Sequence, residues 1–162
     1  MIIENIVCSE TESFDLHGFE IDYVQVEWYE VYKKILHKVS KEGIDVGIKI
    51  DTSSPLKHRD ILWIEGNKAL VIDIPECDCI ALKPQTAIMM GKACYEIGNR
   101  HAPLFYQEDT LLVPYDEPLL RALIKCGFNA YKSSARLISP LGGEAGHGHS
   151  HGHTHEQHSH EH

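Results

Sequence analysis

The first half of the chain alternates apolar and polar residues in short runs, which is the pattern of half-buried β-strands. In the run IDYVQVEW, the alternation places Val24, Val26 and Trp28 on one face of a strand. Turn-forming residues separate the runs, with Gly43 and Gly66 in the two clearest hairpin turns. The pattern predicts a small all-β domain over residues 1–74, with strands at 2–7, 21–28, 31–40, 44–50, 61–64 and 69–74.

In the second half of the chain, the spacing of apolar residues changes from that of a strand to that of a helix. Between Lys83 and Tyr106, apolar residues recur at steps of three and four, which predicts a helix with one buried face. Gly98 and Asn99 are residue types that end a helix in the left-handed conformation, and Pro103 prevents the helix from continuing. His101 is therefore expected on the turn that follows the helix. The residues of the predicted buried face are Ala87, Met90, Gly91, Cys94 and Ile97.

A second helix is predicted between Asp116, a suitable N-cap, and Gly127, with Pro118 in its first turn. Strands are predicted on either side of the two helices, so the elements follow the order βαββαβ. This order is typical of the ferredoxin-like fold, in which two helices cover one face of a four-stranded antiparallel sheet. The predicted class is thus α+β, with the ferredoxin-like domain at 75–138 and its strands at 78–83, 104–107, 111–115 and 130–137.

Charge and cysteine content narrow the function classes. The chain of 162 residues has a formal net charge of −9 and no basic patch interleaved with aromatic residues, which argues against nucleic acid. Neither a leader-like N-terminus nor a run of eighteen apolar residues is present, which argues against export and a membrane span. The five cysteines are an odd number without framework spacing, as expected of reduced thiols in a cytoplasmic protein.

The C-terminal end has the strongest metal-binding composition. Residues 139–146 read as a flexible linker, and we expect 139–162 to form a disordered, histidine-rich tail. Neutral imidazole binds nickel, copper and zinc, so this tail could hold roughly two to four ions with poor selectivity. Binding is expected to weaken as the pH falls through ~6.5, because protons compete for the same nitrogens. The eight candidate ligands are His147, His149, His151, His153, His155, His158, His160 and His162.

The run CYEIGNRHAP, the order of elements and the histidine-rich tail together resemble the UreE family of urease accessory proteins. The resemblance implies a cytoplasmic homodimer that binds nickel and delivers it to apo-urease, with the GTPase UreG and other urease accessory proteins as partners. It matches His101 to the metal-binding histidine at the dimer interface, and implies that the β domain docks partners. One departure is His58-Arg59-Asp60, where the family pattern has a glycine before the aspartate. Another is the run 113–116, which lacks the extra histidines of some members.

Several alternatives stay open on the residues alone. His101 could simply favour the negative end of the preceding helix. Cys77 and Cys79 share one face of a strand and could bind a soft ion, although the chain has no second cysteine pair of the kind that makes a zinc site strong. The protein could also be a nickel or zinc buffer that uses only its tail, or a metal-dependent hydrolase with a ligand cluster inside the fold. No P-loop, dinucleotide-binding loop or nucleophile elbow predicts an enzyme.

Overall fold

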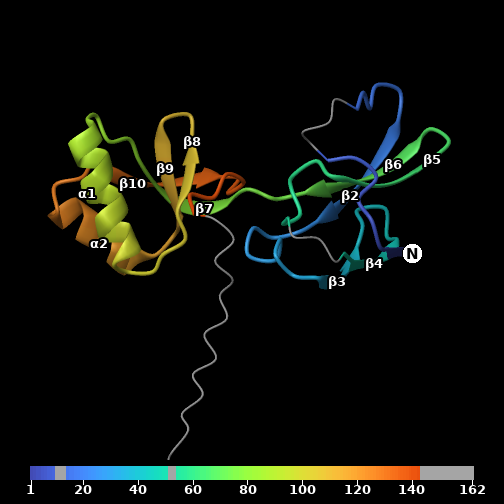
Figure 1. Ribbon diagram of the computed structural model, residues 1–162, viewed down its shortest axis with the longest axis horizontal. Helices are drawn as coiled ribbons and strands as arrows, with labels where there is room; N and C mark the ends of the chain where they lie inside the picture. The colour runs from blue at the N-terminus through green and yellow to red at the C-terminus, as the bar shows by residue number, and fades with distance from the viewer. Residues whose placement is uncertain (10–13, 51–53, 143–162) are drawn as a thin grey trace, which may run out of the picture.

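The computed structural model describes residues 1–9, 14–50 and 54–142. The described chain forms two domains that lie side by side, and a single extended stretch around Pro75 joins them (Figure 1). Each domain has its own cluster of buried side chains. The architecture is therefore the predicted mixture of a small β domain and a sheet covered by helices.

The N-terminal domain contains two three-stranded sheets, with strand orders β1-β4-β3 and β2-β6-β5. Hairpins join β3 to β4 and β5 to β6, whereas β1 pairs parallel to β4 and β2 pairs parallel to β6. The strand bounds are β1 (Ile2–Ile3), β2 (Glu20–Gln25), β3 (Ile35–Val39), β4 (Asp45–Lys49), β5 (Ile61–Glu65) and β6 (Lys68–Asp73).

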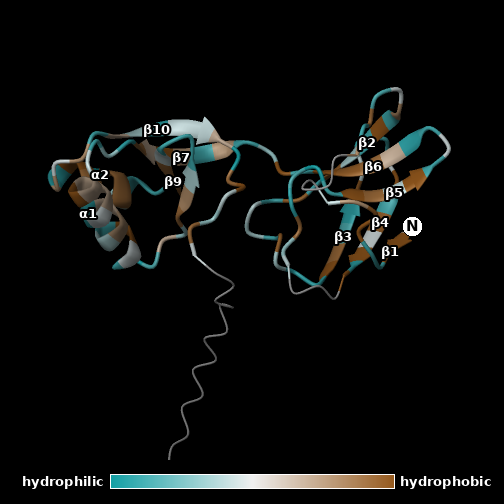
Figure 2. Ribbon diagram, turned by 45° about the horizontal axis from the view of Figure 1, so that its top comes forward, coloured by the Kyte–Doolittle hydropathy of each residue, from teal (hydrophilic) through white to brown (hydrophobic). Residues whose placement is uncertain are grey.

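The core of this domain lies between the two sheets. Val24 and Val26 are fully buried there with Val46, Ile48 and Ile72, as the alternation in the sequence predicts. Figure 2 shows apolar residues concentrated on β1, β5 and β6. Both predicted hairpin glycines have the positive φ that their turns require, 87° at Gly43 and 61° at Gly66.

The C-terminal domain has one antiparallel sheet of strand order β10-β7-β9-β8. Its two helices pack on one face of this sheet, and their buried residues share one core with Ile80, Leu82, Leu111 and Val113. The order of elements is the predicted βαββαβ. Their bounds are β7 (Cys77–Leu82), α1 (Ala87–Gly98), β8 (Phe105–Gln107), β9 (Thr110–Pro114), α2 (Glu117–Lys125) and β10 (Ala130–Ala135).

The face of this sheet without helices is also covered. Cys79, Ala81, Phe105 and Leu112 are buried on this face beneath Leu137, and Trp28 of the N-terminal domain packs against the same cluster. Residues 136–141 cross from β10 to β8, at the opposite edge of the sheet, where Pro140 forms a bridge with Phe105. The chain therefore leaves the folded domain beside β8.

Some predicted bounds are wrong. The first strand contains only Ile2–Ile3, and the strand predicted at 31–40 begins at Ile35. Residues 28–32 form turns instead, because the Glu30 N–H donates to the Glu27 carbonyl (2.8 Å) and the Lys33 N–H donates to that of Glu30 (2.9 Å). The histidines at 147–162 lie outside the described residues. Among the helices that are described, none has the length and apolar character needed to cross a membrane.

Candidate metal centre

His101 lies in the turn that ends α1, and its backbone is unusual. Its φ is 52°, in the left-handed region that non-glycine residues seldom adopt. The His101 N–H donates to the Gly98 carbonyl (2.9 Å), and the Ala102 N–H donates to the Ile97 carbonyl (3.4 Å). These two bonds define a Schellman motif, in which one left-handed residue reverses the chain at the helix end. The imidazole is attached to that residue, which is exposed.

The end of α2 shows what this motif ordinarily uses. Gly127 has a φ of 87°, its N–H donates to the Ile124 carbonyl (2.9 Å), and the Phe128 N–H donates to the Leu123 carbonyl (3.1 Å). The same two bonds are therefore made with glycine in the left-handed position. Glycine adopts this conformation without a steric penalty, whereas a residue with a Cβ is disfavoured by about 1–2 kcal/mol. The histidine at 101 thus costs backbone energy that a glycine would avoid.

The left-handed residue is neither Gly98 nor Asn99, the two positions predicted from residue type. Gly98 is still part of α1, and Asn99, the C-cap, has a right-handed φ of −61°. A turn follows the helix, in which the Arg100 N–H donates to the Ile97 carbonyl (3.1 Å). The reversal takes place after both predicted residues, at His101 itself.

The helix end does not depend on His101 for a positive charge. The Arg100 side chain donates through Nη1 to the Glu96 carbonyl (2.6 Å) and to the Glu96 carboxylate (2.8 Å). A guanidinium on a free carbonyl of the last turn is the favourable arrangement for the negative end of a helix. A favourable interaction with the negative end of the helix is therefore a weak explanation for the imidazole at 101.

One chain does not assemble a complete metal site from its described residues. No group of three or more histidine, cysteine, aspartate or glutamate side chains in 1–9, 14–50 and 54–142 is arranged to hold an ion. His101 offers one nitrogen, whereas a stable site for a divalent transition metal needs about four ligands. A site at His101 would therefore need ligands from outside this set, such as water, a second copy of the chain or residues that the structure does not describe.

The cysteine pair is poorly suited to metal. Cys79 is fully buried under Leu137, and Cys77 is half-buried beside it. Burial raises the pKa of the Cys77 thiol, and the negative charge of Glu27 raises it further. Burial likewise raises the pKa of Cys79. Because a metal binds the thiolate, these thiols are better suited to packing than to metal binding.

The chain that leads to the tail begins close to His101. The Leu141 N–H donates to the Leu104 carbonyl (2.7 Å), and the Tyr106 N–H donates to the Ser139 carbonyl (2.9 Å). The first residues of the predicted linker are thus hydrogen-bonded to the region that opens β8. Leu104 is three residues from His101, a separation of at most about 11 Å along the chain.

The outer side of α1 is apolar and exposed. Ile88 and Tyr95, seven residues apart on one helical stripe, are 73% and 66% exposed. Beside Tyr95 is an open hollow of about 350 Å³, lined by Gly91, Lys92, Glu96, Cys126 and Phe128. Large apolar side chains gathered on one surface are characteristic of an interaction site. The predicted buried face of α1 is wrong in part, because Ala87 and Gly91 are exposed on this outer side and the buried residues are Ala93 and Ile97.

Comparison with known sequences identifies the family. Residues 2–74 match the family "UreE urease accessory protein, N-terminal domain", and residues 71–162 match "UreE urease accessory protein, C-terminal domain". The chain belongs to the UreE family. The family name describes an accessory protein of urease rather than an enzyme.

Named relatives cover nearly the whole chain. The urease accessory protein UreE of Acetivibrio thermocellus is 57% identical over 143 residues, which are 88% of this chain and 93% of the relative. That of Flavobacterium johnsoniae is 41% identical over 138 residues, covering 85% and 83%. That of Helicobacter pylori is 33% identical over 143 residues, covering 86% and 84%.

The departure from the UreE pattern at residue 59 has a structural counterpart. Arg59 has a φ of 70°, so this position needs the glycine-like conformation that the family pattern indicates. The turn is fixed by Asp60, which is fully buried and accepts from the Lys57 N–H (2.7 Å) and the Ser9 hydroxyl (2.9 Å). Arg59 thus occupies a strained position that its neighbours hold in place.

The remaining histidines of the folded part differ from one another. His17 is exposed, and the His37 side chain is 75% exposed with its Nε2 3.9 Å from Asp45, as is typical of solvated residues. His58 is not a solvated surface residue. Its side chain is mostly buried, and its Nδ1 accepts from the Ile74 N–H (3.1 Å). Sequence spacing gives no sign of this contact, because His58 lies before β5 whereas Ile74 lies after β6.

Proposed function

We propose that this UreE-family protein is a cytoplasmic, homodimeric metallochaperone that carries Ni(II) to apo-urease during assembly of its metal centre. Nickel is the cargo, and the same ligands would also bind zinc or copper. The observation that carries the proposal is the histidine at the left-handed position of the α1 turn. The equivalent position of α2 is Gly127, so the backbone motif does not require an imidazole, and this supports a role for His101 as a metal ligand.

A two-fold dimer would supply a second histidine ligand to the same ion. An isologous interface places each surface residue near its own copy, so an exposed histidine beside the axis becomes a pair. The apolar stripe of Ile88 and Tyr95 lies on the helix that ends at this turn, and it supplies apolar area for such an interface. We assign the dimer contact to the outer side of α1.

Residues of the tail can complete the coordination. His147 is six residues beyond Leu141, so the intervening chain spans at most about 20 Å when extended. Leu141 is hydrogen-bonded to Leu104, close to His101. Tethering keeps the tail imidazoles at an effective concentration in the millimolar range around the turn. Ions gathered by His147–His162 would therefore pass to the interface site without full release.

The N-terminal domain is assigned to partner docking. It carries no candidate metal ligand in our proposal and is joined to the other domain by one stretch of chain. We infer that it binds the urease machinery, comprising apo-urease, UreG and other accessory proteins, while the C-terminal domain holds the ion.

Activation of apo-urease at limiting nickel tests the proposal. The wild-type chain, a His101→Gly chain and a chain ended after Gly143 are compared in a mixture of apo-urease and its accessory proteins. A chaperone predicts that His101→Gly lowers the urease activity formed, although the eight tail histidines remain. The alternative of a nickel or zinc buffer predicts that only loss of the tail matters. Equal activation by wild type and His101→Gly would therefore contradict the proposal.

The assigned dimer surface has a test of its own. A carboxylate at position 95 would be buried against its own copy, which is strongly unfavourable without a partner. Tyr95→Glu is expected to shift the protein from dimer to monomer in sedimentation velocity. Tyr29→Glu is the matched control, since Tyr29 is similarly exposed, at 58%, but lies in the other domain. A Tyr95→Glu protein that remains a dimer would place the interface elsewhere.

A further inference from the structure

A polar network joins the two domains where the connecting chain leaves β6. Arg136 follows β10 in the C-terminal domain, and its Nε donates to the carbonyl of Ile74 (2.8 Å). Its Nη2 is 3.6 Å from the carboxylate of Asp73, and its Nη1 is 3.4 Å from that of Glu76. One guanidinium therefore contacts the last strand of the N-terminal domain and the connecting chain at the same time.

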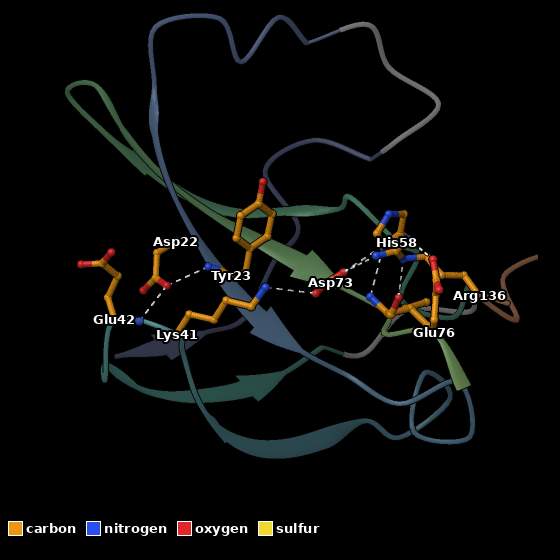
Figure 3. Close-up of polar contacts among 9 residues, drawn as sticks. Asp22, Tyr23, Lys41, Glu42, His58, Asp73, Glu76 and Arg136 are labelled. Atoms are coloured by element: carbon orange, nitrogen blue, oxygen red, sulfur yellow. Dashed lines mark hydrogen bonds and ion pairs between the residues drawn. The ribbon is translucent and has the colours of Figure 1, made fainter. Parts of the chain in front are cut away.

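The N-terminal side of the network is tightly organised. Asp73 is buried, and Figure 3 shows its carboxylate between Lys41 on one side and His58 and Arg136 on the other. Lys41 Nζ is 3.4 Å from Oδ2, while His58 Nδ1 is 3.8 Å from Oδ1. His58 also accepts from the Ile74 N–H, so the peptide groups of Ile74 are held from both domains.

The C-terminal side of the network leads to the strand after the candidate metal turn. The Arg136 carbonyl accepts from Gln107 Nε2 (2.5 Å), and Gln107 is the last residue of β8. β8 begins four residues after His101. Arg136 thus connects the end of β6 in one domain with β8 in the other.

The rest of the domain contact is small. The extensive contacts among the described strands and helices lie within one domain or the other. Across the boundary, the rings of Trp28 and Phe105 meet edge to face, with centroids 5.8 Å apart. The Arg136 side chain remains 38% exposed. Domains joined by few contacts between their strands and helices, with an exposed arginine among those that remain, can be expected to move relative to one another.

We propose that Arg136 is a latch that fixes the orientation of the N-terminal domain relative to the C-terminal domain. While the guanidinium holds Asp73, Ile74 and Glu76, the two domains move as one body. When these contacts open, the domains turn about the connecting chain at Pro75. This inference does not depend on nickel or on His101.

Nuclear spin relaxation of backbone amides in the full chain tests the latch. Rotational correlation times are measured separately for the strands of each domain. The ratio of the N-terminal value to the C-terminal value is then compared between variants. The wild-type ratio is expected to be close to one. In Arg136→Ala, the two domains are expected to tumble separately. The N-terminal domain should then tumble faster, because the C-terminal domain is held in the proposed dimer, and the shorter N-terminal correlation time lowers the ratio. The matched control is Arg121→Ala, because Arg121 is an exposed arginine paired with Glu117 on one helix.

A second variant separates the latch from any loss of folding. Asp73→Asn keeps the size of the side chain and leaves Arg136 in place, but removes the charge that Arg136 and Lys41 contact. It is expected to lower the ratio as well, with amide shifts in the interior of each domain unchanged. A wild-type ratio well below one would overturn the proposal. So would an Arg136→Ala or Asp73→Asn protein whose domains still tumble together.

Discussion

The two helices of the C-terminal domain end in the same backbone motif with different residues. α2 ends at Gly127 and α1 at His101, with matching hydrogen bonds and a left-handed φ in both. In each case the following residue, Phe128 or Ala102, packs into the common core. Glycine is therefore sufficient to form this turn at the end of a helix. The motif itself thus does not require an imidazole at 101.

Arg59 shows that a strained residue is not by itself a site. It has a left-handed φ like that of His101, but it sits in a turn whose buried contacts are made by Asp60. Backbone strain is a reason to ask about function rather than proof of it. At His101 the strained residue carries an exposed imidazole, a side-chain type that binds nickel, which is the reason to test this position.

The largest effect is expected on metal binding. In the chain ended after Gly143, His101→Gly should weaken nickel binding at least about tenfold, or ~1.4 kcal/mol, because it removes the imidazole and keeps the turn. Isothermal titration measures the affinity. The matched variant combines His101→Gly with Gly127→His, which retains the composition and moves the imidazole to the other helix end. Wild-type affinity in this swapped protein would show that the position of the imidazole is irrelevant.

The next largest effect is expected on stability at the other helix end. Gly127→Ala puts a Cβ on a residue with a φ of 87°, and should lower the free energy of unfolding by about 1–2 kcal/mol. The structure leaves open space for this Cβ, so the cost comes from the backbone and not from a clash. Urea unfolding measures it. His101→Ala serves as control, because a Cβ is already present there, and it should change stability much less. Equal losses in the two variants would contradict the comparison.

A smaller gain is expected at Arg59. Arg59→Gly relieves the left-handed strain, but glycine also raises the conformational entropy of the unfolded chain. The net increase in the free energy of unfolding should therefore be about 0.5–1 kcal/mol. Thermal or urea unfolding measures the change, and nickel binding should be unaltered. A loss of stability would mean that the arginine side chain itself supports the turn.

The smallest effect is expected in the hairpin between β8 and β9. Glu108 has a φ of 47° and Asp109 one of 61°, the signs of a type I′ turn, in which asparagine is preferred. Glu108→Asn should raise the free energy of unfolding by a few tenths of a kcal/mol, or ~0.3 kcal/mol. The measurement is urea unfolding in parallel with Thr110→Ser as a conservative control. A destabilised Glu108→Asn protein would contradict this interpretation of the turn.

Local patterns predicted local structure well. The caps of α2 are confirmed, since the Asp116 carboxylate accepts from the Leu119 N–H (2.7 Å) and Gly127 ends the helix. The alternation in 21–28 correctly placed Val24 and Val26 in the core. These features are set by residues close together in the sequence, so one segment contains the information needed to predict them.

Features that depend on distant residues were not predictable in this way. The contact of Arg136 with Ile74 joins residues 62 positions apart, and His58 is buried only because it reaches the end of β6. The left-handed residue of the α1 turn was placed at Gly98 or Asn99 by residue type, but packing of Ile97 and Ala102 in the core moves the reversal to His101. Residue preferences are weak compared with such packing.

The most direct test of the central claim is the nickel stoichiometry of the chain ended after Gly143. Equilibrium dialysis measures the bound nickel, and sedimentation equilibrium measures the assembly state of the same sample. A site shared by two copies of His101 predicts half an ion per chain in a dimer. A dimer that binds no nickel, or that binds one ion per chain, would contradict a shared site at the α1 turn.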